Sequence, residues 1–93
     1  MDLVQILGTR VRQRREHLGW SQTALAEQTG IPTPNLSRIE HGRQSIYIAR
    51  LVDLAEALQV STDYLLGRTD DPTPVPPNPP PKRPRSRKTT PVG

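Results

Sequence analysis

The sequence predicts an all-α domain of five short helices over residues 1–68, followed by a tail over residues 69–93. Two observations support this division. Before residue 68, apolar residues recur at helical spacing between glycines, and no window alternates strictly enough to indicate a strand. Nine of the 11 prolines follow residue 71, and so dense a run of proline cannot form helix or sheet. We therefore expect a compact folded domain and a disordered, polyproline II-like tail.

The first helix is expected to cover about four turns and to end at Gly19. Its apolar residues recur at helical spacing and are Leu3, Ile6, Leu7, Val11 and Leu18. Arg12 and Arg14 lie between them, and they fit a solvated face and phosphate contacts equally well.

A second and a third short helix are expected on either side of a turn at Gly30. Ser21 can cap the second helix through its hydroxyl. Thr33 can cap the third, which places Pro34 at its first helical position, and Gly42 ends it. The third helix therefore begins in an unusually proline-rich stretch.

The fourth helix is again amphipathic, with apolar residues at Ile48, Leu51, Val52, Leu54, Ala55 and Leu58. Ser61 is placed to cap a fifth, shorter helix, and Asp63 in its first turn suits the helix dipole. Gly67 closes this last element.

Residues 20–43 match the plan of a helix-turn-helix, in which two short helices are joined by a tight turn. Ala26 lies where the helices cross and must be small, and Gly30 lies where φ is expected to be positive. The apolar residues that must clamp the two helices together are Leu25, Ile31, Leu36 and Ile39. Trp20 is interpreted as a core and hinge residue. In such a motif the second helix enters the major groove of DNA.

Several segments also resemble the Cro/Xre-type helix-turn-helix family of phage repressors and bacterial regulators. They include Leu18-Gly19-Trp20-Ser21-Gln22, Leu36-Ser37-Arg38-Ile39-Glu40 and Val60-Ser61-Thr62-Asp63-Tyr64-Leu65-Leu66-Gly67. The resemblance extends over residues 3–67. It implies a compact, lambda-repressor-like fold and a sequence-specific regulator of transcription that binds double-stranded DNA, most simply as a repressor.

The resemblance further implies individual roles. Base edges would be read by Thr33, Pro34 and Arg38, with Asn35 and Ser37 flanking them; phosphates would be held by Gln22, His41 and Arg43; and Arg15 would form a partly buried ion pair with Glu40. Arg38 can offer two donors to guanine. A cap at Thr33 would use that hydroxyl internally, which leaves Arg38 as the principal reader. Position 46 is Ile where the family often has Pro, so the Gln44–Tyr47 loop has no firm expectation.

One helix-turn-helix reads only a few base pairs, so we expect a homodimer on a two-fold operator. The fifth helix supplies the candidate interface residues Tyr64, Leu65 and Leu66. An alternative function is a protein-interaction module on the same fold that binds a partner, such as a toxin, and not DNA.

Charge is divided unevenly along the chain. Residues 1–68 hold eight Arg and seven Asp or Glu, whereas residues 69–93 hold five Lys or Arg and two Asp. A nearly neutral domain must bind DNA by placing its arginines on one face. The basic tail fits a solubilising extension, an arm that adds non-specific DNA affinity, or a ligand for a protein partner.

Other function classes have little support in the sequence. Without Cys there are no disulfides or thiolate metal sites, and His17 and His41 have no carboxylate at ligand spacing, so no metal or cofactor is expected. No nucleophile, phosphate-binding or dinucleotide motif is present, so we expect no enzyme. The absence of a long apolar run and of a signal-peptide pattern favours a cytoplasmic protein with no membrane partner.

Overall fold

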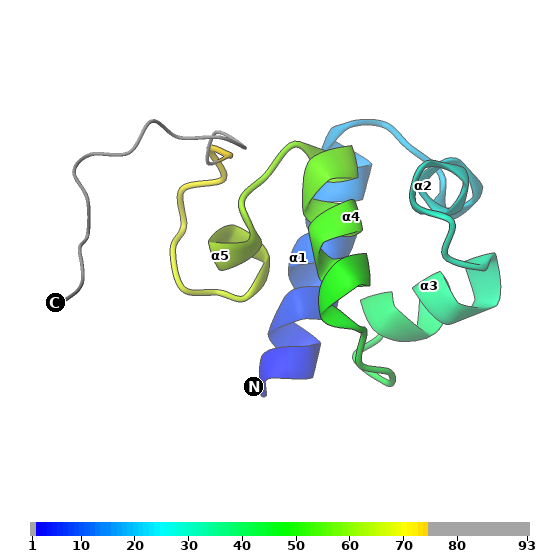
Figure 1. Ribbon diagram of the computed structural model, residues 1–93, viewed down its shortest axis with the longest axis horizontal. Coiled ribbons are helices and arrows are strands. Elements are labelled where there is room, and N and C mark those ends of the chain that lie inside the picture. The colour runs from blue at the N-terminus through cyan, green and yellow to red at the C-terminus, as the bar shows by residue number, and fades with distance from the viewer. Residues whose placement is uncertain (1, 75–93) are drawn as a thin grey trace, which may run out of the picture.

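The computed structural model describes residues 2–74, and in that range it contains helices and no strand. The helices are α1 (Leu3–His17), α2 (Gln22–Thr29), α3 (Thr33–Glu40), α4 (Ile48–Leu58) and α5 (Thr62–Leu65). Helices α2 and α3 lie to one side of α1 and α4, and α5 lies to the other (Figure 1). The predicted five-helix, all-α architecture is confirmed. The expectations for residues 75–93 lie outside the described residues.

Helix α1 begins at a reciprocal cap. The Asp2 carboxylate accepts a hydrogen bond from the Gln5 amide at 2.9 Å, and the Gln5 side chain accepts one from the Asp2 amide at 3.0 Å. These two bonds satisfy backbone donors that a helix start leaves free. The helix stops before Gly19, whose φ of 77° reverses the chain. Leu3 is 56% exposed, so the expected apolar face begins one turn later.

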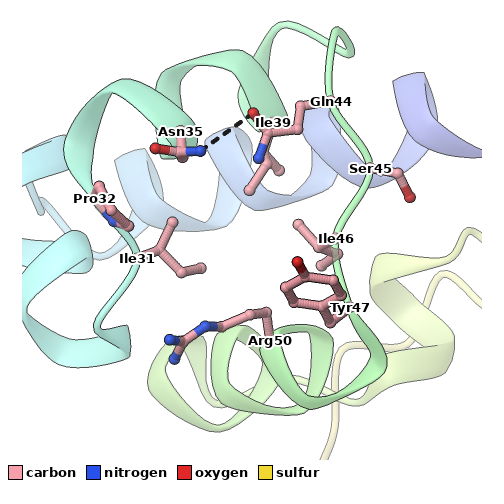
Figure 2. A pocket seen from close by; sticks show the side chains of 9 residues that line it. All are labelled: Ile31, Pro32, Asn35, Ile39, Gln44, Ser45, Ile46, Tyr47 and Arg50. Carbon is pink, nitrogen blue, oxygen red and sulfur yellow. Dashed lines mark hydrogen bonds between the residues drawn. The ribbon is translucent and has the colours of Figure 1, made fainter.

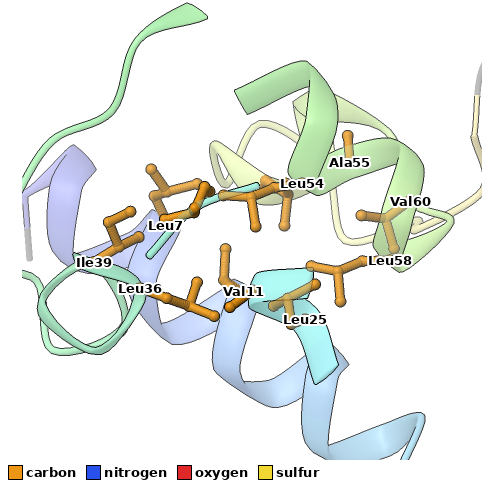
Figure 3. Close-up of a cluster of buried hydrophobic side chains, with 12 residues drawn as sticks. Leu7, Val11, Leu25, Leu36, Ile39, Leu54, Ala55, Leu58 and Val60 are labelled. Atoms are coloured by element: carbon orange, nitrogen blue, oxygen red, sulfur yellow. The ribbon is translucent and has the colours of Figure 1, made fainter. Parts of the chain in front are cut away.

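The core fills the space where α1 to α5 converge, and Figure 3 shows its side chains pointing toward one another. Its fully buried large members are Val11, Leu25, Leu36, Ile39, Leu54, Leu58 and Leu65. The predicted amphipathic fourth helix is present as α4, in which Leu54 and Leu58 are buried while Ile48 and Val52 are exposed. Only part of the apolar side of α4 is therefore covered by the core.

Gly8 sets the distance between α1 and α3. A Cβ added at this position would lie 2.2 Å from the backbone oxygen of Ile39 and 2.9 Å from that of Glu40. Glycine in mid-helix weakens the helix relative to alanine. Here it lets the backbones of the two helices touch, which seats the C-terminal half of α3 directly on α1.

Helix α5 is held within the same molecule on two sides. Leu65 is fully buried, so it cannot form a dimer interface as predicted. The guanidinium of Arg10 lies 4.5 Å from the centre of the Tyr64 ring, and it also donates to the Thr69 carbonyl and the Asp70 carboxylate. The hydrogen bond to Asp70 raises the pKa of Arg10.

The folded body continues beyond the expected boundary at residue 68. The Ser61 amide donates to the Pro72 carbonyl at 3.1 Å, and Ser61 itself is buried. Together with the Arg10 contacts, this bond fixes residues 69–72 against α1 and the start of α5. No helix among residues 2–74 is long and apolar enough to span a membrane.

Candidate nucleic-acid interface

Helices α2 and α3 form the predicted helix-turn-helix. The Ser21 hydroxyl accepts a hydrogen bond from the Ala24 amide at 3.1 Å and caps α2 as expected. Gly30 has a φ of 76°, which confirms the left-handed turn. The Thr29 hydroxyl donates to the Leu25 carbonyl and accepts from the Ile31 amide, so the turn satisfies its own buried polar groups.

The start of α3 differs from the prediction. The N-cap residue is Pro32, which has no side chain able to cap, and Thr33 is the first helical residue. No hydrogen bond within residues 2–74 uses the Thr33 hydroxyl. The expectation that Thr33 spends its hydroxyl as a cap was therefore wrong, because the fixed φ of Pro32 begins the helix one residue earlier.

The exposed side of α3 gathers most of the expected base-reading residues. Counted at 100° per residue, one face of the helix carries Thr33, Pro34, Ser37, Arg38 and His41. Leu36, Ile39 and Glu40 are buried on the opposite side. Arg38 is exposed and has no ion-pair partner among the described residues.

An ion pair holds α3 against α1. Arg15 donates from Nε to Glu40 at 2.7 Å and from Nη2 to the second carboxylate oxygen at 3.0 Å. Its Nη1 donates to the Trp20 carbonyl at 2.8 Å. The Glu40 side chain is 1% exposed and that of Arg15 is 11% exposed. The bond to Glu40 raises the pKa of Arg15, and the pair holds the C-terminal end of α3 against α1.

Gln22 belongs to the same cluster. Its side-chain amide donates to Glu40 Oε1 at 3.0 Å and joins the start of α2 to the end of α3. This contact orients Gln22 beside the free amides of the first turn of α2, where a helix N-terminus favours anions. The expected phosphate contact stays a prediction, and the structure adds a positioning role for this residue.

Asn35 points toward the loop that follows α3. Its amide donates to the Gln44 side chain at 3.4 Å, a long and weak bond, across a groove of about 530 Å³ (Figure 2). Ile31, Ile39 and Ile46 line this groove. Asn35 is thus set apart from the face that carries Arg38 and braces the loop.

His41 and Arg43 lie at the C-terminal end of α3 and are both exposed. The His41 ring lies 2.7 Å, through Nδ1, from the Ser37 carbonyl. A carbonyl only accepts, so Nδ1 carries the proton and Nε2 faces away. The Arg43 amide donates to the Arg38 carbonyl, which completes the turn at Gly42.

The other arginines are occupied elsewhere. Arg14 donates to the Leu58 carbonyl at 3.0 Å and so satisfies an orphan carbonyl near the end of α4, while Arg12 pairs with Glu16 on the surface of α1. The reading of Arg14 as a phosphate contact loses its basis. Arg50, which sequence reasoning missed, donates to the Thr29 carbonyl at 2.8 Å and ties α4 to the turn. Nothing in its local sequence signals this contact.

Comparison with known proteins also identifies a helix-turn-helix in this chain. A family model described as helix-turn-helix matches residues 11–65, which contain α2, α3, α4 and α5 in full. A transcriptional regulator from the ATPase CF(0) region of Rhodospirillum rubrum is 43% identical over 58 residues, which cover 62% of this chain and 54% of that protein. Repressor protein C2 of Salmonella phage P22 is 37% identical over 62 residues, 67% of this chain and 29% of that protein.

Solved structures agree with these matches. The P22 c2 repressor in complex with a synthetic operator superposes with a TM-score of 0.63 at 37% identity, over 64% of this chain and 91% of that chain. The restriction-modification controller C.AhdI of Aeromonas hydrophila superposes with a TM-score of 0.64 at 27% identity, over 67% of this chain and 94% of that chain. The chain spans about half the length of the Rhodospirillum relative. By its matched segment, its five-helix frame and its relatives, this chain belongs to the Cro/Xre-type helix-turn-helix family.

Proposed function

We propose that this chain binds double-stranded DNA in a sequence-specific manner through α3 and regulates transcription, most simply as a repressor. The observation that carries the proposal is the exposed face of α3. It presents Arg38 without a partner among the described residues, on a helix locked to α1 by the buried Arg15–Glu40 pair. The similarity to a repressor solved on its operator supports the same assignment.

In this proposal the residues have two roles, contact with base edges and contact with phosphates. Arg38 would read guanine through two parallel hydrogen bonds, and Thr33 would add its hydroxyl and methyl group to the reading of a neighbouring base. Phosphates would be held by Gln22, His41 and Arg43. Ser37 and Pro34 would contact the DNA surface beside the bases that Arg38 and Thr33 read. Asn35 would support the adjoining loop. These contacts need no catalytic step, and their site of action is intracellular DNA.

Selection from a pool of random duplexes on the full chain is the direct test, because it yields the bound sequence without assuming one. We then expect Arg38→Ala to relax the preference at one or two positions, at a cost of about 1–3 kcal/mol on the selected duplex. Arg12→Ala is the matched control, since it removes an exposed arginine that pairs with Glu16 on α1. No sequence enrichment, or equal effects of the two substitutions, would contradict specific reading by α3.

A second candidate function is recognition of a protein partner. It is favoured by one comparison, in which the SinR protein/SinI protein complex superposes with a TM-score of 0.62 at 36% identity. Under this reading the α3 face contributes nothing to specificity, and DNA affinity would come from the basic tail. Deleting residues 75–93 distinguishes the two, because a specific reader retains its selected sequence and loses only salt-sensitive affinity.

A further inference from the structure

Large apolar side chains are exposed along the outer side of α4. Ile48 is 80% exposed and Val52 41%, and Tyr47, which directly precedes the helix, is 81% exposed. Ile48 and Val52 are four residues apart, so they lie one turn apart on the same side of the helix. Single exposed apolar residues are ordinary on a protein surface, whereas a contiguous group indicates a contact site.

A groove continues this apolar side toward the C-terminal end of α4. It has a volume of about 420 Å³, and its lining includes Val52, Ala55, Gln59, Val60, Thr62 and Pro74. Val52 belongs to both the exposed group and the groove, so the two form one continuous surface. We call this surface, from Tyr47 through Val52 to Pro74, the α4 strip.

Pro74, the last described residue, already lies in this groove. The residues before it fix its position. The Ser61 amide donates to the Pro72 carbonyl at 3.1 Å. The Thr73 hydroxyl and amide both donate to the Asp71 carboxylate, at 2.7 Å and 3.0 Å. The chain beyond residue 74 therefore starts from the C-terminal end of the α4 strip.

The composition of residues 75–81 suits an apolar surface. Five of these seven residues are proline, and the other two are Val75 and Asn78. Because proline has no backbone N–H, such a segment can lie against a helix and bury few donors without partners. Proline-rich segments in the polyproline II conformation also dock on surfaces that present aromatic side chains, and Tyr47 presents one here.

The length of this segment also matches the α4 strip. Seven residues in the polyproline II conformation extend roughly 22 Å. From Gln59 to Tyr47 the helix axis extends roughly 18 Å. Residues 75–81 are therefore long enough to pass along the whole strip, which would bring residue 82 beside Tyr47.

We propose that residues 75–81 dock on the α4 strip of the same molecule and run antiparallel to α4. The proline rings would cover Val52, Ile48 and Tyr47. This segment is favoured over a separate molecule as the occupant, because its attachment at Pro74 gives it a millimolar effective concentration at the strip. DNA is a poor occupant, because it requires cations and the charged residue in the groove lining is Glu56.

Docking would also place the basic run that follows the prolines. This consequence rests on the proposed function. Residues 82–88 hold five Lys or Arg, and they would begin at the loop between α3 and α4. Arg43 lies in the same loop, close to the end of α3. The five cations would therefore lie beside the phosphates that Arg43 holds, at the edge of the DNA site.

The test measures where residue 82 lies in the full chain. The sequence has no cysteine, so Lys82→Cys provides a single attachment site for a nitroxide spin label, which broadens the NMR signals of nearby amides. We expect the strongest broadening at the amides of Tyr47 and Ile48. A segment that does not dock would broaden mainly the amides around Ser61, close to its attachment, and that result overturns the proposal.

Variants of the α4 strip show whether its apolar side chains hold the segment. Ile48→Ser and Val52→Ser, each in the spin-labelled chain, should remove most of the broadening at Tyr47. Leu3→Ser is the matched control, because it removes a 56% exposed apolar side chain from α1. Equal broadening in the strip variants and the control overturns the proposal. A contact populated about half the time changes the folding equilibrium only about twofold, so thermal melts should show nearly constant Tm.

A mixing experiment identifies the molecule on which the segment docks. Isotope-labelled protein without the spin label is mixed with spin-labelled protein that is invisible in the spectrum. We expect no broadening at Tyr47 in this mixture. Broadening there would mean that the segment occupies another copy, which overturns docking within one molecule.

DNA binding separates this proposal from the function on which its consequence rests. If the segment is docked about half the time and a strip variant lowers this to about a tenth, affinity for the selected duplex should fall about fivefold, with the bound sequence unchanged. Broadening at Tyr47 without any selected duplex would leave the docking established and refute the proposed function. Equal affinity in variants that have lost the broadening would overturn the contribution of docking to DNA binding.

Discussion

Replacing Gly8 with alanine tests how closely α3 must sit on α1. The added Cβ would lie 2.2 Å from the Ile39 carbonyl oxygen, whereas ordinary contacts begin at 3.4 Å, so the helices must separate by roughly 1 Å. Overpacking of this kind costs about 1–3 kcal/mol, and the obstacle is backbone, which cannot rotate away. Alanine returns about 1 kcal/mol through its higher helix propensity. We expect the clash to win and the variant to lose up to about 2 kcal/mol of stability.

Thermal unfolding followed by circular dichroism measures this loss. For a domain of this size, each kcal/mol lowers Tm by roughly 4–8 °C. Gln13→Ala is the matched control, because it places alanine at an exposed position of the same helix, and its Tm should be unchanged or slightly higher. A Gly8→Ala protein at least as stable as the wild type would refute the argument that backbone contact, and not helix propensity, decides this position.

Three further changes test other parts of the structure. Glu40→Gln leaves the nearly buried Arg15 guanidinium without its counter-charge. It should lower the free energy of unfolding, measured in urea, by about 3 kcal/mol, and added salt should not restore the lost stability. Deleting residues 69–93 should lower the unfolding free energy by about 1 kcal/mol through loss of the Ser61–Pro72 bond, whereas deleting 75–93 should not; equal Tm values for the two truncations would argue against the extended boundary. Thr33→Val keeps the shape of the side chain and removes the unbonded hydroxyl, so it should weaken binding to the selected duplex while leaving Tm unchanged.

Helix positions were predictable because their signals are local. Ser21 and Ser61 cap the helices that follow them, as hydroxyls before apolar runs indicate. Gly30 adopts positive φ where a tight turn between two helices requires it. The start of α3 was misjudged by one residue, because a proline can begin a helix through its fixed φ without offering any cap.

The sequence indicated which residues of α3 face outward, but not which neighbours their side chains contact. Helical spacing alone places Pro34 and Arg38, which are four residues apart, on the same side of α3, so this outward side follows once the helix is accepted. The orientation of Asn35 toward Gln44, and the bond from Gln22 to Glu40, depend on neighbours that are distant in the chain. No sequence pattern indicated either contact.

The sequence by itself determined the five helices, the turn at Gly30 and the identity of the helix that would read DNA, since caps, glycines and apolar spacing act over a few residues. Tertiary structure decided which apolar residues are buried. Ile48 and Leu54 look alike in the pattern of α4, yet one faces solvent and the other the core. It also decided that position 8 must be glycine and that Arg50 donates a hydrogen bond to the turn between α2 and α3. Both features depend on elements that meet only when the chain is folded.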